Sequence, residues 1–171
     1  MVKKIEKNIN SNNNATASSS KKLDRLDCNL IGLLQTDGRM PNNAIAQKLG
    51  ISEYTVRRRM KRFIDGGIIR IVAVANPIDL GFEIAGNLKI RIDLKKTERV
   101  LENLKKIDSL IYVALTTGGT DVDADFIVRS LKEFHDLIFN QISQIDGVLS
   151  TETSLQVDIV KDKYDWGTGW D

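Results

Sequence analysis

The second half of the chain contains strand-like and helix-like segments in one particular order, which restricts the fold more than any other feature of the sequence. Segments that alternate apolar and polar residues, or are continuously apolar, predict strands, whereas apolar residues three and four positions apart predict helices. Between residues 85 and 160 the predicted order is β-α-β-β-α-β, with segments at 87–93, 97–107, 110–116, 121–128, 131–145 and 150–160. This order is typical of a ferredoxin-like domain, in which two helices cover one face of a four-stranded antiparallel sheet.

Such a sheet has a second face that its own helices leave uncovered. The strand expected at 110–116 has apolar residues on both sides, and strands of this kind are normally buried on both faces. A second copy of the same domain would cover the face, which predicts a homodimer formed through the sheets. The alternative is that the N-terminal part of the same chain covers it.

Three helices are expected in residues 23–67. In the first, leucines recur at helical spacing, Asp24 can cap the N-terminus, and Asp27 lies in the first turn, where the helix dipole favours an acidic residue. The second helix is short, and its Ala46 is small enough to let two helices cross closely. Gly50 follows four residues later, where the chain must turn sharply into the third helix. The pattern predicts a helix-turn-helix domain over residues 23–67.

The third helix is expected to begin at Ser52 and to bury one apolar stripe, formed by Val56, Met60 and Phe63. The opposite face is basic, with hydroxyl groups interleaved, and Arg59 is expected nearer the core. Arginine binds guanine edges or phosphates and hydroxyl groups bind phosphates, so we expect this face to lie in the major groove of DNA. The predicted DNA-binding residues are Tyr54, Thr55, Arg57, Arg58, Lys61 and Arg62.

The charge distribution favours a polyanionic partner for the first part of the chain. Residues 1–70 contain 14 lysines and arginines against 6 acidic residues, whereas residues 71–171 contain 11 against 17. A basic part is therefore joined to an acidic part, which favours double-stranded DNA as the partner of the helices. Two alternatives stay open: a functionless unevenness of surface charge, and a three-helix protein-interaction domain whose arginine-rich helix is only solvated.

Three further segments lie outside the two domains. Residues 1–22 are polar and of low complexity, which predicts a disordered tail or, alternatively, a basic arm on the phosphate backbone. Residues 68–84 are expected to form a strand at 68–75 followed by a linker, and residues 161–171 are expected to form a C-terminal tail.

Composition and motifs argue against several classes of protein. One cysteine, Cys28, and one histidine, His135, exclude a disulfide framework, a cysteine-cluster zinc site and a multi-histidine metal site. The sequence contains no glycine-rich phosphate loop and no nucleophile elbow, so we expect neither an enzyme nor a cofactor. No apolar run approaches about 18 residues and the polar N-terminus is unlike a secretory signal, which predicts a cytoplasmic protein without a membrane span.

The sequence resembles the Lrp/AsnC (leucine-responsive, feast/famine) transcriptional regulators over roughly residues 23–160. The resemblance is carried by the stretches 23–39, 45–52, 56–62, 66–69, 117–121, 145–148 and 151–153. It implies an α+β fold, in which an N-terminal helix-turn-helix domain is joined by a β-strand linker to a ferredoxin-like domain for oligomerisation and effector binding, over residues 85–160. It further implies dimers that assemble into octamers or similar rings, pseudo-palindromic promoter DNA as the partner, and a response to an amino acid.

The resemblance also implies an effector pocket at the loop between the second and third strands. Glycine N–H groups can hold a carboxylate, and an aspartate can hold an ammonium group. The implied effector-binding residues are Thr117, Gly118, Gly119, Thr120, Asp121 and, in the same region, Ser150, Thr151 and Thr153. The chain departs from the family in having Thr120 where an aromatic residue is common. Asp121, Asp123 and Asp125 alternate onto one face, where they suit either an amine-bearing ligand or a solvated acidic edge.

The combined features predict a sequence-specific DNA-binding transcriptional regulator whose oligomeric state and DNA binding respond to a small amino acid. Two other hypotheses remain at this point. One is an architectural protein that wraps DNA without any effector response. The other is an amino-acid-binding protein that does not bind DNA and uses its helices to bind protein.

Overall fold

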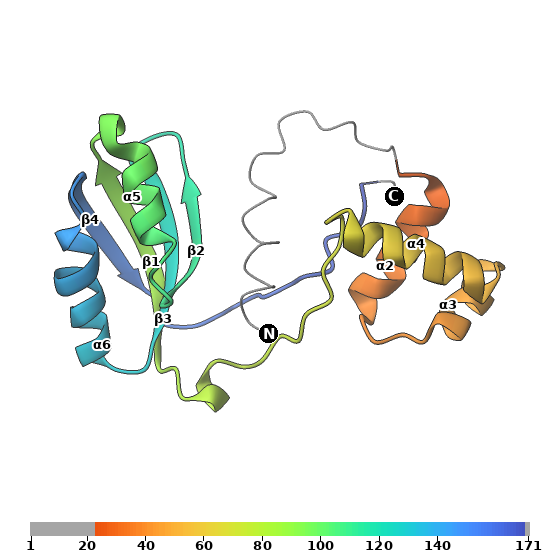
Figure 1. The fold of residues 1–171 in the computed structure, drawn as a ribbon. Helices are drawn as coiled ribbons and strands as arrows, with labels where there is room; N and C mark the ends of the chain where they lie inside the picture. Colours follow the sequence, from red (N-terminus) through yellow and green to blue (C-terminus); the bar gives the residue numbers. More distant parts are fainter. Residues whose placement is uncertain (1–22, 170–171) are drawn as a thin grey trace. The chain divides into compact units, whose positions relative to one another are not determined.

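A computed structural model describes residues 23–169, which form two units (Figure 1). The first unit consists of residues 23–73 together with residues 162–169, and the second of residues 74–161. The tail predicted at 1–22 lies outside the described residues.

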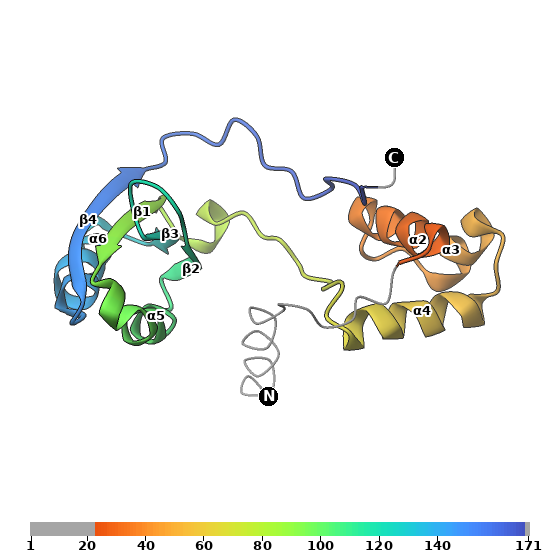
Figure 2. The ribbon, with the colours of Figure 1, turned by 90° about the horizontal axis from the view of Figure 1, so that it is seen from above.

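The first unit is built from three helices that pack together (Figure 2): α2 (Arg25–Thr36), α3 (Asn42–Leu49) and α4 (Glu53–Asp65). Gly50 ends α3 in the left-handed conformation, with φ of 65°, which glycine adopts without strain and which allows the sharp turn into α4. The turn confirms the predicted helix-turn-helix. The core is made of the buried apolar residues Leu30, Ile31, Leu34, Ile45, Ala46, Val56 and Phe63.

The last residues of the chain also belong to this unit. Residues 162–169 run beside α2 without forming a helix or strand. There the side-chain amide of Gln35 donates a hydrogen bond of 3.2 Å to the carbonyl oxygen of Gly167. The helical unit is therefore assembled from two stretches of sequence that are far apart along the chain.

The second unit is a four-stranded antiparallel sheet with strand order β2-β3-β1-β4 and helices on one face. This order confirms the predicted ferredoxin-like fold. Along the chain, its elements are β1 (Ile84–Ile92), α5 (Thr97–Leu104), β2 (Leu110–Leu115), β3 (Val122–Val128), α6 (Leu131–His135) and β4 (Val148–Leu155). Short 3-10 turns at Ile78–Leu80 and Leu94–Lys96 precede β1 and α5.

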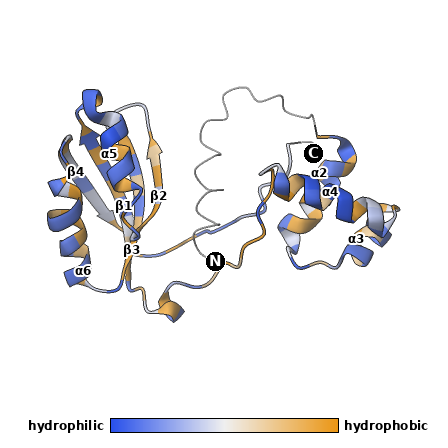
Figure 3. Cartoon of the chain, viewed as in Figure 1, coloured by the Kyte–Doolittle hydropathy of each residue, from blue (hydrophilic) through white to orange (hydrophobic). Residues whose placement is uncertain are grey.

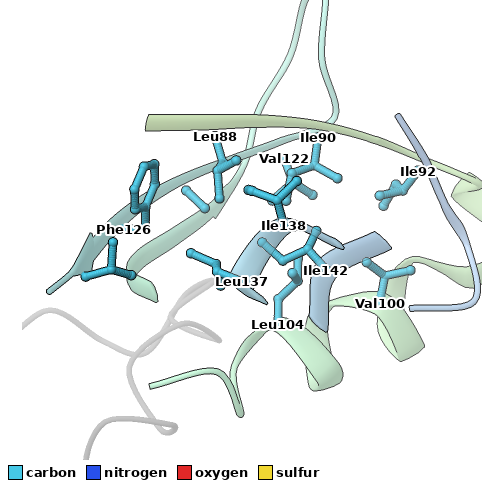
Figure 4. Close-up of a cluster of buried hydrophobic side chains, with 12 residues drawn as sticks. Leu88, Ile90, Ile92, Val100, Leu104, Val122, Phe126, Leu137, Ile138 and Ile142 are labelled. Atoms are coloured by element: carbon cyan, nitrogen blue, oxygen red, sulfur yellow. The ribbon is translucent and has the colours of Figure 1, made fainter. Parts of the chain in front are cut away.

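The core of the sheet unit lies between the sheet and its two helices (Figure 4). Alternate residues of β1 and β3 are buried against the helices because successive side chains of a strand point to opposite faces. On the helix side, Val100 and Leu104 of α5 and Leu137 contact this layer. The strand residues of the layer are Leu88, Ile90, Ile92, Val122, Ala124, Phe126 and Val128.

The second helix of this unit is less regular than the amphipathic pattern over 131–145 predicts. After α6 the chain forms a π-helical turn at Asp136–Gln141 and a 3-10 turn at Ile142–Gln144. In the wider π turn, residues five apart become neighbours, which brings both Leu137 and Ile142 onto the sheet. The side chain of Ser143 donates to the carbonyl oxygen of Ile138, five residues before it.

The sheet face without helices is apolar only in part. On the central strands it carries polar and charged side chains, since the residues opposite each other there are Asn87 with Asp125 and Lys89 with Asp123. Exposed apolar side chains occur on this unit's edge strand β2 instead, at Ile111 and elsewhere. The expectation concerned the strand at 110–116, and β2 does expose apolar side chains. The opposite edge strand, β4, also exposes Leu149 and Leu155.

Two predicted strand segments are not formed. Residues 69–76 are extended but unpaired, so the strand predicted at 68–75 is wrong, and β4 ends at Leu155 rather than at residue 160. A strand requires a neighbour to pair its N–H and C=O groups, and neither segment has such a neighbour among residues 23–169. Their apolar side chains are consequently exposed, with Val157 at 99%.

We expect Gly86→Ala to destabilise the sheet unit, because a Cβ atom there would lie 2.3 Å from the Ser154 carbonyl oxygen and 2.7 Å from the Phe126 ring. Overpacking of this kind costs about 1–3 kcal/mol. Urea unfolding of the full chain measures the change. Gly119→Ala in the same unit is the control, since a Cβ atom at Gly119 meets nothing within 4 Å. Equal midpoints for the two variants would contradict the prediction.

Candidate DNA-binding face and effector loop

Helix α4 is positioned by its N-terminal cap and by its apolar stripe. The Ser52 side chain accepts a hydrogen bond of 3.1 Å from the backbone N–H of Thr55, and the two hydroxyl oxygens lie 2.9 Å apart. Val56 and Phe63 are fully buried, which fixes the face that α4 turns towards the core. The Thr55 hydroxyl, predicted to bind DNA, is therefore already engaged in the cap.

Much of α4 is hydrophilic (Figure 3), and the side chains on the face opposite its apolar stripe are exposed. Tyr54 is 73% exposed, and the side chains of Arg57 and Lys61 are 70% and 76% exposed. Arg58 is also exposed. The structure therefore brings four of the six predicted DNA-binding residues together on one accessible helix face. Arg59, as expected, lies nearer the core, with its side chain 18% exposed.

A cluster of ion pairs connects α4 to the first turn of α2. Asp27 is 1% exposed and lies between two arginines: it pairs with Arg59, and its Oδ2 lies 2.5 Å from Nη2 of Arg62. Nη1 of Arg59 also donates to both carboxylate oxygens of Asp24, at 2.7 and 2.8 Å. Asp24 and Asp27 form a capping box at the start of α2 as well. Arg62, predicted to bind DNA, thus has a partner within its own unit.

The electrostatics of this cluster favour the charged forms of Asp24 and Arg59. The hydrogen bond from Arg59, followed by that from the backbone N–H of Asp27, lowers the pKa of the Asp24 carboxyl from its ordinary value. Hydrogen bonds to Asp24 and then Asp27 raise the pKa of Arg59. Arg59 therefore stays charged, and the cluster holds α4 against α2.

The cluster was missed by the sequence analysis, although a signal for it exists. Asp27 precedes Leu30 by three positions and Ile31 by four, so it falls on the apolar stripe of α2. An acidic residue on such a stripe requires a basic partner, because an unpaired buried charge is strongly unfavourable. Arg59, expected near the core on its own helix, was the available candidate.

The loop between β2 and β3 is short and partly ordered by its own hydrogen bonds. Thr116 donates through its hydroxyl to the carbonyl oxygen of Thr120 (3.1 Å) and through its N–H to that of Asp121 (2.9 Å). Gly118 has φ of 122°, a conformation that favours glycine. Thr117, Gly118 and Gly119 are exposed. Within the described residues the N–H groups of the two glycines have no hydrogen-bond partner, so they are free to bind an anion.

The remaining predicted effector residues divide between the two faces of the sheet. Ser150 lies opposite Arg91, at the end of the sheet where the loop reaches β3. Thr151 and Thr153 lie opposite the buried Ile90 and Leu88, which places them on the helix-covered face. The structure brings Ser150 to the end of the sheet that holds the loop and leaves the two threonines on the other face.

The acidic residues that follow the loop have local partners. Oδ2 of Asp121 accepts a hydrogen bond of 2.9 Å from the backbone N–H of Ile92. The side-chain amide of Asn87 donates to both Asp123 and Asp125, at 3.1 Å in the latter case. Among residues 23–169 no group of histidine, cysteine and acidic side chains is arranged to hold a metal ion. In the same residues no helix has the length and apolar composition needed to cross a bilayer.

Comparison with known proteins identifies both units. Residues 23–64 match the AsnC-type helix-turn-helix domain, and residues 88–166 match the Lrp/AsnC ligand binding domain. An HTH-type transcriptional regulator of Pyrococcus furiosus is 34% identical over 146 residues, which cover 85% of this chain and 96% of the relative. The chain belongs to the Lrp/AsnC family. The HTH-type transcriptional regulator Ptr1 of Methanocaldococcus jannaschii is 33% identical to this Lrp/AsnC protein, over 82% of the chain and 95% of Ptr1.

Solved structures share the fold of this Lrp/AsnC protein. The structure of AsnC from E. coli matches with a TM-score of 0.76 at 24% identity, covering 83% of this chain and 97% of AsnC. A transcriptional regulator from Neisseria meningitidis, solved in complex with L-Met, matches with a TM-score of 0.77 at 20% identity, covering 84% and 96%. The family resemblance and the fold class are thereby confirmed, and the protein is a transcriptional regulator with a DNA-binding and a ligand-binding domain.

We expect Asp24 to contribute stability that is lost in acid. Because its pKa is lowered in the folded chain, the contribution is present above the pKa of the unfolded chain, about 4, and disappears as the pH falls through the lowered value. Asp24→Asn retains a cap but loses the ion pair with Arg59. Thermal unfolding followed by circular dichroism should show a lower midpoint for this variant at about pH 7, and a smaller difference from wild type towards about pH 2.

The control for this experiment is Asp37→Asn, which removes an exposed carboxylate that forms no ion pair within the described residues. Its midpoint should follow that of the wild type at each pH. A deficit of Asp24→Asn that stays constant across the pH range would contradict an ionic contribution from Asp24.

Proposed function

We propose that this Lrp/AsnC regulator recognises specific promoter DNA by placing α4 in the major groove. The observation that carries the proposal is the face of α4 turned away from its own core, where Tyr54, Arg57, Arg58 and Lys61 are exposed together. Arginine and lysine there reach base edges and phosphates, and the Tyr54 hydroxyl reaches phosphates. Thr55 and Arg62 lie at the margins of this face. Arg62 can still donate to DNA through the guanidinium N–H groups that do not pair with Asp27.

We further propose that the protein acts as a homodimer joined through the open faces of its sheets. The exposed apolar side chains of Ile111 and Tyr112 on β2 support burial of this edge. A twofold dimer presents two copies of α4 to two half-sites, which suits pseudo-palindromic DNA. Dimers then assemble into a larger ring, for which an octamer is the form we favour.

The ligand-binding domain is proposed to respond to a small amino acid at the β2–β3 loop. The free N–H groups of Gly118 and Gly119 suit a carboxylate, and Asp121 suits an ammonium group. The L-Met in the Neisseria meningitidis structure supports an amino acid as the class of ligand. Thr117, Thr120 and Ser150 line the same end of the sheet, whereas Thr151 and Thr153 contribute from its other face. The pocket is completed by another subunit.

The proposed mechanism is linkage between assembly and DNA binding. An effector held where subunits meet binds one assembly state better than another, and it can shift the equilibrium only by that difference in affinity. The favoured state then sets the spacing of the α4 helices on DNA. The function is one of binding, without a catalytic step.

Arg58→Ala should weaken binding to selected operator DNA by about 1–3 kcal/mol and relax the base preference, because Arg58 is exposed on the centre of the basic face. Electrophoretic mobility shift or fluorescence anisotropy on a fragment selected from random DNA measures the loss. Arg39→Ala, which removes an equal charge outside α4, should have a smaller effect. An unchanged footprint for Arg58→Ala would remove this residue from the interface.

Calorimetry of the full chain with L-Met and the other common amino acids tests effector binding. We expect at least one to bind, and Asp121→Asn to bind it about tenfold or more weakly because the charge that holds the ammonium group is lost. Asparagine retains an oxygen that can accept the hydrogen bond from Ile92, so the loop keeps its anchor. No heat with any amino acid would instead favour an architectural DNA-binding protein without an effector.

A further inference from the structure

The basic face of α4 carries its own counter-ions. Arg57 pairs with Glu53 at 2.6 Å, and Lys61 pairs with Asp65 at 2.6 Å, in both cases through residues four apart on the helix. The two arginines nearest the core pair with the carboxylates of α2, as described above. Among the basic residues of α4, Arg58 alone forms no ion pair within the part of the chain that the structure describes.

The pair between Lys61 and Asp65 is poorly placed to stabilise the helix. Asp65 is the last residue of α4, where the partial negative charge of the helix dipole disfavours a carboxylate. A lysine that precedes its acidic partner by four residues is also the weaker orientation of such a pair. Both side chains are exposed, at 76% and 60%, and exposed pairs contribute little to stability. Helix stability therefore does not account for Asp65.

The position of the two carboxylates relates them to DNA instead. Lys61 lies on the face proposed to meet the phosphate backbone, so a phosphate that approaches its ammonium group must displace Asp65 and is repelled by it. Glu53 is equally close to Arg57 at the opposite end of α4, although its place in the first turn also suits the helix dipole. Glu53, Arg57, Lys61 and Asp65 are spaced four apart and form one row along α4, with Arg58 unpaired beside it. Each end of this row thus holds an acidic competitor within hydrogen-bond distance of a basic side chain.

We propose that Asp65 and Glu53 lower the affinity of this regulator for non-specific DNA by competing with phosphates for Lys61 and Arg57. The proposal rests on the DNA-binding role of α4 proposed above. Non-specific binding depends almost entirely on phosphate contacts, so a competitor at each end of this row weakens it, while Arg58 stays available for base edges. The two carboxylates are therefore specificity-determining residues that do not need to touch a base.

Binding of the full chain to a mixed-sequence duplex of about 30 base pairs, measured by anisotropy over a series of salt concentrations, tests the proposal. Asp65→Asn should bind about two- to fivefold more tightly at about 0.1 M salt. The slope of the logarithm of its binding constant against the logarithm of salt concentration should become steeper by up to about one, because one further counter-ion is released. Glu53→Gln should change both quantities in the same direction. Asp37→Asn makes an equal change of net charge at the end of α2 and should leave the salt dependence unchanged.

A double variant separates competition from a general change in charge. Asp65→Asn should give no gain in affinity when Lys61 is already replaced, as in Lys61→Gln, because the carboxylate then has nothing to mask. Equal effects of Asp65→Asn and Asp37→Asn, or an undiminished gain in the double variant, would overturn the inference while leaving DNA binding by α4 intact. Failure of the wild-type chain to bind any duplex at low salt would overturn both.

Discussion

The buried carboxylate of Asp27 is the contact on which the orientation of α4 depends. It is excluded from solvent and neutralised by Arg59 and Arg62 of α4. A charge in such a position tolerates little displacement, because removing one partner of a buried pair costs about 3–5 kcal/mol. The pairs therefore restrict rotation of α4 about its own axis. That rotation determines which residues of α4 face the core and which are exposed on the outer surface.

The helical unit was predictable from the sequence as far as local spacing determines structure. The cap at Asp24, the turn at Gly50, and the position of Arg59 near the core follow from helical periodicity and from residue chemistry. The ion pairs between α2 and α4 were not predicted, because they depend on how two helices are rotated against each other. Periodicity places a residue on one face of its helix but does not identify the residue it meets on another.

In the sheet unit, too, the local features were predicted and the features that depend on a neighbouring segment were not. The order of strands and helices was predicted, because alternating and helical patterns are local. The strand predicted at 68–75 and the end of β4 failed, because strand formation depends on a neighbour and not on β-branched residues alone. The π turn at Asp136–Gln141 also escaped prediction, since it adjusts a helix to the spacing of the sheet beneath it. In the candidate site, Ser150 and the threonines of β4 point to opposite faces because side chains alternate along a strand, which the sequence alone could have shown.

The hydrogen bond between Gln35 and Gly167 affects how the protein can be dissected. It closes a loop of chain that contains the entire sheet unit, so the two ends of that unit are both attached to the helices. A fragment that stops after residue 73 lacks part of its own surface, and a deletion from the C-terminus alters the helices before it reaches the sheet. A fusion partner or affinity tag attached to the C-terminus would likewise be placed next to the helical unit rather than next to the sheet unit.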